Sequence, residues 1–280
     1  MEVIIVDSPE QVATRAARMV SELIQKKPGA VLGLATGSSP IAMYRILIAA
    51  CKRGEISFGG VTSFNLDEYI GLPPQSPHSY RHFMQQQLFD HIDIPAQQTN
   101  LPTCYPGDNP REVGDAYEQR ILRAGGIDLQ ILGIGGNGHI GFNEPSSSLV
   151  SRTRIKTLTH RTVEANSRLF QEGEFQPHLA MTMGIGTILD ARHILLLATG
   201  ENKAAAVRDA IEGPLCARCP GSALQLHRRA VLVLDRAAAS DLEETDYYQW
   251  VESQHISLVE EYGHYYDLGS ENQIQPGIAP

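Results

Sequence analysis

Apolar residues along the chain fall into short runs that alternate with segments of helical periodicity. In runs such as 129–134 and 230–234 nearly every side chain is apolar, which is typical of a strand buried on both faces of a sheet. The runs that predict strands cover residues 3–6, 30–35, 61–64, 129–134, 193–198 and 230–234.

The segments between these runs carry the start and stop signals of helices. Ser8-Pro9-Glu10-Gln11 resembles a capping box with proline at the first helical position, and Pro28-Gly29 ends the helix that follows. Further helices are predicted from the turn at 36–40 to about residue 50, from Asn109-Pro110 to before Gly125, and over 201–211. Strands separated by such helices predict crossover units, and so an α/β fold with a mostly parallel sheet and helices on both faces.

A single α/β domain is expected over residues 1–240, with a C-terminal helix and tail over 241–280. Residues 141–190 hold few strand signals and much polar sequence. They are interpreted as an insertion or a lid over a site, with the lid segment at about 158–182. The last residues, 273–280, are expected to be frayed.

Composition narrows the function classes. A net charge of −9 over 280 residues argues against a nucleic-acid or polybasic membrane binder, which needs a broad positive field, although a few local cations can hold a small anion. The longest apolar run, 46–51, is far shorter than the about 20 residues of a spanning helix, and the N-terminus does not resemble a signal peptide. The cysteines Cys51, Cys104, Cys216 and Cys219 are too few for a disulfide scaffold, so a cytoplasmic location is expected.

The first candidate site is the turn Thr36-Gly37-Ser38-Ser39-Pro40. It follows a buried strand and opens a helix, so its hydroxyls and backbone N–H groups suit an anion at the helix N-terminus. It lacks the Gly-Lys-Ser/Thr sequence of a nucleotide P-loop. Phosphate binding and an ordinary Ser/Thr helix cap both remain open for this turn.

The second candidate is Asn65-Leu66-Asp67-Glu68-Tyr69, where adjacent acids directly follow a strand. Neighbouring side chains point different ways, so only one of the acids is expected to face a site. A carboxylate there can take a proton from a carbon beside a carbonyl. A helix cap or a solvated turn is the alternative interpretation.

The third candidate is the glycine-rich loop from Gly133 to Pro145. It contains the GxGxxG pattern, but no helix or acid-terminated strand is predicted after it, which argues against dinucleotide binding. The glycines instead display His139 and Glu144, a pair that suits acid–base work. A structural histidine is the alternative.

Other residues carry weaker signals. His78 and His82 lie four residues apart without a third ligand, and Cys216-Ala-Arg-Cys219 has no second cysteine pair, so no metal is expected. Two free thiols are favoured for that cysteine loop over a redox disulfide. The basic run Arg152, Arg154, Lys156 is either surface charge or a second anion site, and Lys203 begins a helix after a strand, a suitable place to meet a phosphate.

The three loops, in this order, resemble the glucosamine-6-phosphate deaminase (isomerase) family. The matching stretches lie roughly within residues 30 to 235 and include LGLATGSSP, SFNLDEYIGLP, LGIGGNGHIGFNEP, SRTRIKTLTH and ANSRLF. The segment GHIGFNEP is highly specific, because the related 6-phosphogluconolactonases share a Gly-His loop without the FNEP ending. The resemblance implies a Rossmann-like fold, no metal, no organic cofactor, and a small sugar phosphate as partner.

The resemblance also implies an activity, in which glucosamine 6-phosphate and water give fructose 6-phosphate and ammonia in amino-sugar catabolism. Asp67 matches the base that moves a proton between C2 and C1 through an enolamine. His139 matches the residue that opens the pyranose ring, and Glu144 matches its carboxylate partner. The residues that match the phosphate pocket are Thr36, Gly37, Ser38, Ser39, Arg168 and Lys203.

The chain departs from some family members at Asn137, where they carry Asp. An amide cannot accept a proton but can orient the imidazole by hydrogen bonding, so Asn137 is assigned a positioning role. Ser147, Arg154 and Lys156 match part of a second site, at which N-acetylglucosamine 6-phosphate activates some hexameric members. A homo-oligomer and allosteric activation are therefore both open.

Competing functions are a 6-phosphogluconolactonase-like hydrolase, a deaminase for another hexosamine phosphate, and a non-catalytic sugar-phosphate sensor. A sensor usually carries a DNA-binding or partner domain, and no helix-turn-helix segment or basic stretch is evident. Asp67, His139 and Glu144 together favour an enzyme. Release of ammonia from glucosamine 6-phosphate separates these possibilities.

Overall fold

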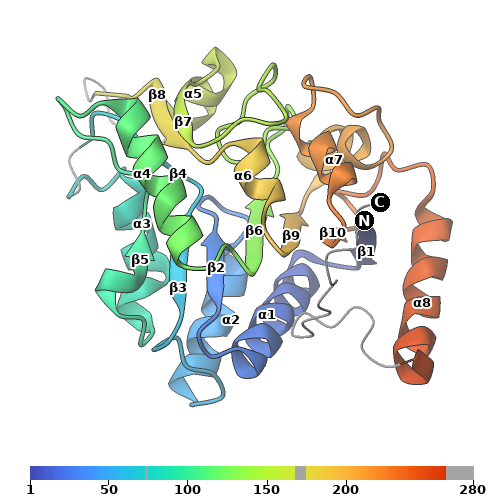
Figure 1. The fold of residues 1–280 in the computed structure, drawn as a ribbon. Helices are drawn as coiled ribbons and strands as arrows, with labels where there is room; N and C mark the ends of the chain where they lie inside the picture. Colours follow the sequence, from blue (N-terminus) through green and yellow to red (C-terminus); the bar gives the residue numbers. More distant parts are fainter. Residues whose placement is uncertain (73–74, 168–174, 263–280) are drawn as a thin grey trace, which may run out of the picture.

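A parallel sheet organises the chain in the computed structural model, which describes residues 1–72, 75–167 and 175–262 (Figure 1). Its strands are Glu2–Val6 (β1), Val31–Leu34 (β2), Thr62–Asn65 (β3), Thr99–Asn100 (β5), Leu129–Gly133 (β6), His193–Ala198 (β9) and Ala230–Asp235 (β10). Their order across the sheet is β1-β10-β9-β6-β2-β3-β5, and every neighbouring pair is parallel. The predicted strands are all present, and β5 is an addition that the apolar pattern did not show.

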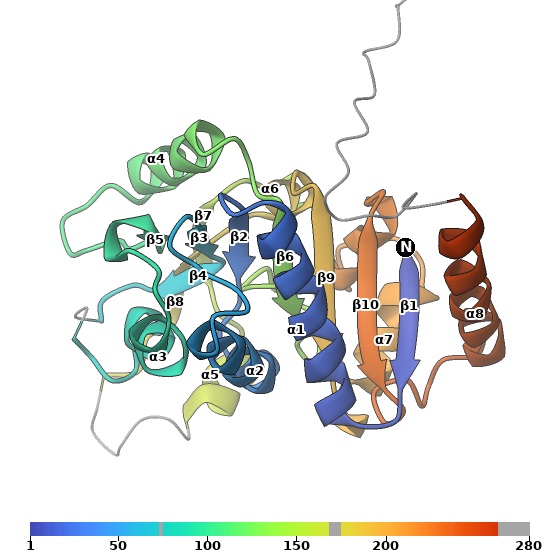
Figure 2. The ribbon, with the colours of Figure 1, turned by 90° about the horizontal axis from the view of Figure 1, so that it is seen from below.

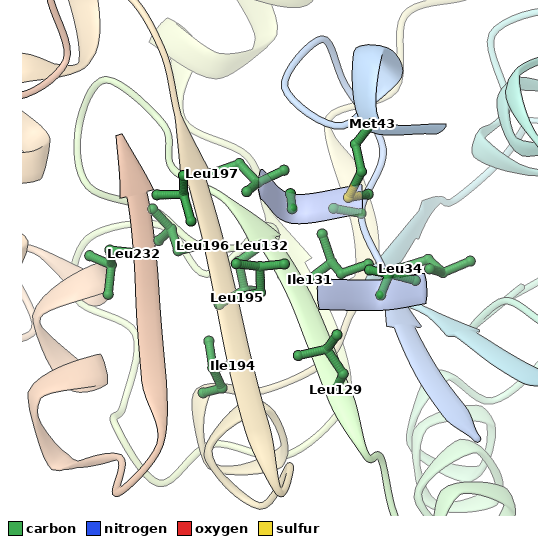
Figure 3. Packing of buried hydrophobic residues seen from close by; sticks show 14 of the residues in the cluster. Leu34, Met43, Leu129, Ile131, Leu132, Ile194, Leu195, Leu196, Leu197 and Leu232 are labelled. Carbon is green, nitrogen blue, oxygen red and sulfur yellow. The ribbon is translucent and has the colours of Figure 1, made fainter. Parts of the chain in front are cut away.

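The continuous apolar runs form the strands at the centre of this sheet. All residues of β2 and β9 are buried, and so are the first four of β6. Figure 3 shows the side chains of Leu129, Ile131 and Leu132 on β6 beside those of β9. Because both faces are covered, apolar side chains are favoured at successive positions.

Helices cover both faces of the sheet, as predicted. Their bounds are Pro9–Lys26 (α1), Ile41–Lys52 (α2), Tyr80–Gln87 (α3), Pro110–Arg123 (α4), His160–Ser167 (α5), Ile185–Leu189 (α6), Ala204–Ile211 (α7) and Thr245–Tyr262 (α8). Short 3-10 turns cover Phe89–His91 (η1), Ala96–Gln98 (η2), Glu201–Lys203 (η3) and Pro220–Leu226 (η4). Figure 2 shows α1 and α2 on one side of the sheet and α4 on the other.

Helix α1 begins where the capping signals predict. The hydroxyl of Ser8 accepts a hydrogen bond from the backbone N–H of Gln11, and Pro9 occupies the first helical position. The Gln11 side chain accepts from the backbone N–H of Asp7, one residue before the cap. The local sequence therefore satisfies two N–H groups at this end of the helix.

A second, antiparallel sheet was not predicted. It consists of Asp67–Tyr69 (β4), Leu179–Thr182 (β8) and Arg154–Thr157 (β7), with β8 in the centre. Two of its strands come from the stretch 141–190, whose low strand signal was misleading. Within the expected lid segment, 160–167 form α5 and 179–182 form β8, while 168–174 lie outside the described residues.

The C-terminal helix α8 packs beside β1 at the edge of the parallel sheet (Figures 1 and 2). Glu252 of α8 lies 3.7 Å from Arg15 of α1, and His255 lies 4.0 Å from Glu2 of β1. The described helix thus contacts the body of the α/β domain. None of the described helices is long and apolar enough to cross a membrane.

The chain reverses its direction of travel across the sheet between β2 and β6. From β2 it proceeds through β3 to β5 at one edge, whereas from β6 it proceeds through β9 to β10 toward the other. The loops that leave the carboxyl ends of β2 and β6 therefore diverge. A crevice at this topological switch point is the expected ligand site of an open α/β sheet.

Candidate active site

A cavity of about 710 Å³ lies at the switch point. All three predicted loops contribute to it: residues 35–39 follow β2, 66–67 follow β3, and 134–137, 139, 141 and 142 follow β6. Its remaining walls include Tyr80, Thr162, Glu164, Thr199, Asn202 and Lys203. Loops from three strands, far apart in sequence, thus converge as the sheet topology requires.

The predicted phosphate loop lies in this cavity, with Thr36, Gly37, Ser38 and Ser39 all in its wall. The loop leads into the twelve-residue helix α2, whose N-terminus has no side-chain cap. Backbone N–H groups at the start of a helix attract anions, because their partial positive charges add to the helix dipole. No side chain of this turn caps α2, so an ordinary Ser/Thr cap is not observed, and the anion site remains a prediction.

A matching turn follows β9 and lies across β6 from the first. Thr199, Asn202 and Lys203 line the cavity there, so Lys203 is placed as predicted. Thr199 was missed, although a signal was present: Leu-Ala-Thr-Gly occurs at both 34–37 and 197–200. Arg168, the other predicted phosphate ligand, lies outside the described residues.

Asp67 and Glu68 separate into different roles, as predicted for adjacent acids. Asp67 lines the cavity, whereas the Glu68 carboxylate accepts hydrogen bonds from the backbone N–H groups of Tyr69, Tyr80 and Arg81. Glu68 thereby caps the N-terminus of α3. The helix-cap interpretation is right for Glu68 and wrong for Asp67.

The surroundings of Asp67 disfavour its charge. The residue is 5% exposed, and a methyl group added at Gly141 would lie 3.3 Å from its Oδ2. Burial, and secondarily the negative charge of Glu68, raises the pKa of Asp67 to about 8, while the backbone N–H of Phe142 offsets only part of this. A carboxylate with a pKa near neutrality can both accept and return a proton.

The glycine-rich loop after β6 holds His139 at the cavity wall. No helix forms over 134–153, so the GxGxxG pattern does not build a dinucleotide site here. Gly135 is required for close packing, because a Cβ there would lie 2.2 Å from Cε1 of the His139 imidazole. The imidazole is 24% exposed, and its Nδ1 faces inward, 3.5 Å from Oε2 of Glu144.

Glu144 is almost completely buried, at 1% exposure, and is surrounded by donors. Asn137 Nδ2 donates to its Oε2 at 2.8 Å, and Thr162 Oγ1 donates to its Oε1. Burial alone would raise the pKa of Glu144, but contacts with His139, Thr162 and Asn137 outweigh it and lower the pKa to about 2. Glu144 is therefore a fixed negative charge beside His139.

Asn137 has the positioning geometry that the sequence suggested. Its amide nitrogen binds Glu144, and its Oδ1 accepts from the backbone N–H of His139 at 3.3 Å. The amide thus connects the backbone of one residue of the pair to the side chain of the other. It orients Glu144 directly and the imidazole only indirectly.

The residues predicted for a second anion site, Ser147, Arg154 and Lys156, do not line the cavity. The buried Ser147 hydroxyl donates to the Glu144 carbonyl, and Arg154 donates to Oδ1 of Asn143. Lys156 lies two residues further along β7, with its pKa lowered by burial and by the charge of Arg154. The third cation of this run, Arg152, forms ion pairs of 2.6 Å with Glu118 and Asp190.

Besides the turn after β9, sequence reasoning missed polar side chains of the cavity that lie on helices, among them Tyr80 and Thr162. Tyr80 is the first residue of α3, and its ring stacks on Phe142 at 5.7 Å between centroids. Thr162 belongs to α5 and binds Glu144. Both reach the cavity through long-range packing, for which the local sequence carries no signal.

Metal-ligating residues do not cluster in the part of the chain that the structure describes, where no three His, Cys, Asp or Glu side chains come together. The cysteines Cys51, Cys104, Cys216 and Cys219 are free thiols. Cys216 and Cys219 belong to a turn closed by a hydrogen bond from the Cys219 backbone N–H to the Cys216 carbonyl.

Comparison with known proteins gives consistent matches. A family model described as glucosamine-6-phosphate isomerases/6-phosphogluconolactonase matches residues 7–233. The glucosamine-6-phosphate deaminase of Colwellia psychrerythraea is 59% identical over 267 residues, which are 95% of this chain and 100% of that protein. The enzyme of the same name from Hahella chejuensis is also 59% identical, over 92% of this chain and 98% of its own.

Solved structures share this fold, and they differ in how similar they are to the chain. A monomeric glucosamine-6-phosphate deaminase superposes with a TM-score of 0.83 at 43% identity, covering 86% of this chain and 100% of its own. The 6-phosphogluconolactonase of Leishmania guyanensis reaches a TM-score of 0.66 at 19% identity, covering 85% and 97%. The second similarity shows a shared fold only.

Proposed function

The chain belongs to the glucosamine-6-phosphate deaminase family, and we propose that its cavity converts glucosamine 6-phosphate and water into fructose 6-phosphate and ammonia. The observation that carries this proposal is the convergence of Asp67, the His139–Glu144 pair and the Thr36–Ser39 turn on one cavity. Isomerisation of a cyclic amino sugar needs a base, a ring-opening acid and an anchor. Each of these loops supplies one of them.

The phosphate anchor lies between the turns after β2 and β9. Thr36, Ser38 and Ser39 offer hydroxyls and backbone N–H groups, and Lys203 supplies a cation. Arg168 completes the anchor on the basis of the family resemblance. Binding energy from a phosphate remote from C1 and C2 holds the reacting carbons in place, which lowers the entropic part of the barrier.

His139 opens the pyranose ring. The imidazole takes the proton of the C1 hydroxyl and delivers a proton to the ring oxygen, so the ring C–O bond breaks and an open-chain aldehyde forms. Histidine suits both transfers because one imidazole nitrogen can accept a proton while the other donates one. Glu144, held ionised by its donors, stabilises the imidazolium that forms between the transfers.

Asp67 then acts on the open chain. Its carboxylate removes the C2 proton to give an enolamine and returns a proton to C1, which leaves an imine at C2. Water adds to that imine, and ammonia departs to give the ketose. The ammonium of the bound substrate brings a positive charge near Asp67, which favours the ionised base despite its raised pKa.

The Ser147, Arg154 and Lys156 cluster is assigned to a second sugar-phosphate site that regulates the enzyme. Support comes from the lowered pKa of Lys156, which is due first to burial and then to the positive charge of Arg154, because a bound anion would favour the charged lysine. Contacts from Ser147 and Arg154 to residues 143 and 144 connect that cluster to the Glu144 loop. Such a site would pair with a homo-oligomer. A phosphorylated substrate, which cannot diffuse across membranes, suits a cytoplasmic location.

An activity assay tests the proposal. The full chain is incubated with glucosamine 6-phosphate, and ammonia and fructose 6-phosphate are measured separately, with and without N-acetylglucosamine 6-phosphate. Equal amounts of the two products are expected, and 6-phosphogluconolactone in a parallel assay should be hydrolysed no faster than in buffer. Lactone hydrolysis without ammonia release would replace the deaminase with the lactonase alternative.

A further inference from the structure

The two oxygens of the Glu144 carboxylate have separate sets of neighbours. Oε2 faces the catalytic loop, with Asn137 Nδ2 at 2.8 Å and His139 Nδ1 at 3.5 Å. Oε1 faces the other way, toward Thr159 and Thr162. The proposed catalytic pair uses only the first oxygen, so the neighbours of the second are not explained by it.

Thr162 provides the main contact to Oε1. Its side chain is buried, at 6% exposure, and its Oγ1 donates to the carboxylate. The Thr159 hydroxyl is 3.3 Å from the same oxygen and 3.0 Å from the Thr162 hydroxyl. Thr159 also accepts from the Thr162 backbone N–H, which fixes the first turn of α5.

The position of Thr162 is set by packing that is independent of Glu144. Leu158 is buried in a small apolar cluster with Tyr69 and Phe142, and Val163 packs against that cluster. These residues flank Thr162 on both sides in the sequence. The hydroxyl is therefore held against Oε1 by an apolar contact that does not involve the carboxylate itself.

We propose that Thr162 is a positioning residue for ring opening, a role that rests on the proposed function. Its hydroxyl holds Oε1, and this fixes the rotation of the carboxylate so that Oε2 faces the His139 imidazole. It also keeps the carboxylate ionised, because a buried charge with one donor fewer has a higher pKa. Through Thr162, the placement of α5 determines whether the His139–Glu144 pair is assembled.

The placement of Asn137 makes this second anchor necessary. Asn137 and His139 both approach Oε2, so neither of them restrains rotation about the terminal carboxylate bond from the opposite side. A carboxylate held at one oxygen only can turn and move the other oxygen out of line. The Thr162 hydroxyl supplies the shortest contact to the far oxygen, and the Thr159 hydroxyl adds a longer one at 3.3 Å.

Substitutions at Thr162 separate the hydroxyl from the packing. Thr162→Val keeps the branched shape and removes the donor, whereas Thr162→Ser keeps the donor and removes a methyl group. Thr157→Val is the matched control, because Thr157 is an exposed residue of β7 outside the cavity. All variants are made in the full chain and assayed with glucosamine 6-phosphate and with a 4,5-dideoxy analogue, which lacks both hydroxyls that could close a furanose or pyranose ring.

Thr162→Val is expected to lower kcat for glucosamine 6-phosphate by about tenfold or more, which is part of the roughly 10²–10⁴-fold that general acid–base catalysis contributes. The open-chain analogue should react at the parent rate. The acidic limb of the pH–rate profile should move to higher pH, because Glu144 loses a donor and its pKa rises. Thr162→Ser and Thr157→Val should resemble the parent in all three measurements.

Several outcomes would overturn the assignment. Equal slowing of both substrates by Thr162→Val would make the residue structural, and an unchanged pH profile would remove its effect on Glu144. A Thr162→Ser variant as impaired as the valine variant would assign the effect to packing. If the parent releases no ammonia from glucosamine 6-phosphate, the proposed function fails first, and that result is distinct from any difference among the variants.

Discussion

Asp67 lines the cavity and Glu144 lies beside His139 of its wall, and although both acids are buried, their surroundings shift their pKa values in opposite directions. Asp67 lies on the β3–β4 side, where burial raises its pKa to about 8. Glu144 lies on the loop after β6, where donors from His139, Thr162 and Asn137 overcome an unfavourable burial and lower its pKa to about 2.

Glu144 keeps its charge because donors surround it, whereas Asp67 has the backbone N–H of Phe142 to offset only part of its burial. The pKa of each acid suits the role proposed for it. A base that must take and return a proton needs a pKa near neutrality, while the partner of an imidazolium must remain ionised throughout.

The largest effect is expected at Asp67. Asp67→Asn keeps the size of the side chain but cannot accept a proton, so turnover should fall by about 10²-fold or more while substrate binding is retained. Exchange of the C2 proton with deuterated solvent, followed by NMR, should stop. Near-normal exchange in this variant would remove Asp67 from the role of base.

The next largest effect is expected at His139, the partner of Glu144. His139→Gln should slow reaction of the closed pyranose by about 10²-fold, because both proton transfers of ring opening are lost. An analogue that cannot cyclise should be nearly unaffected. Equal slowing of the cyclic and acyclic compounds would contradict a ring-opening role and point instead to positioning of the enolamine.

Loss of the phosphate anchor should weaken substrate binding, and so reduce the reactions of Asp67 and of His139 alike. Lys203→Ala is expected to weaken binding of glucosamine 6-phosphate by about 1.5–3 kcal/mol, the usual contribution of a hydrogen bond to a charged group. Arg168→Ala should behave similarly, and Lys52→Ala, at the far end of α2, is the control. Unchanged affinity in both test variants would place the phosphate pocket elsewhere.

The smallest effect is expected at Asn137. Asn137→Asp replaces the donor to Oε2 of Glu144 with a second acid, so the two neighbouring carboxyl groups hold a shared proton up to a higher pH. The imidazolium of His139 also gains a negative neighbour. Both changes raise the acid-side pKa of the rate profile, while activity at neutral pH changes by less than about tenfold, the equivalent of one pKa unit. A profile that moves to lower pH would contradict the contact between Asn137 and Glu144.

The central strands of the parallel sheet could be predicted because they are apolar on both faces, a pattern that depends only on burial, whereas the edge strand β5, which reads Thr-Asn, could not. The antiparallel sheet could not. Its strand β4 reads Asp-Glu-Tyr and β7 reads Arg-Ile-Lys-Thr, so their pairing is imposed by the tertiary structure rather than by strand propensity.

The residues of the candidate site also fall into a group that the sequence could predict and a group that it could not. Asp67, His139, Glu144 and the turn after β2 follow strands directly, so the sheet topology alone brings them to one edge. Tyr80 and Thr162 arrive on helices that pack over that edge, and only the folded chain reveals them. The repeated Leu-Ala-Thr-Gly of the turns after β2 and β9 was a readable signal for Thr199.

The contrast between the two acids also determines how each contributes to stability. Asp67 has a folded pKa above its ordinary value of 3.8, so between about pH 4 and 8 folding retains a proton and stability falls as pH rises. Glu144 has a folded pKa below its ordinary value of 4.5, so its contribution is complete above pH 4.5 and is lost as pH falls toward 2.

Unfolding free energies of Asp67→Asn and Glu144→Gln, measured from pH 5 to pH 8 against the parent, test this account most directly. Asp67→Asn should be more stable than the parent by about 1 kcal/mol or more at pH 7, with a gain that grows toward pH 8, because each pKa unit corresponds to about 1.4 kcal/mol. Glu144→Gln should be less stable by a similar amount at every pH in that range. Losses of stability in both variants, or a gain for Asp67→Asn that does not change with pH, would contradict the opposite protonation states on which the proposed roles depend.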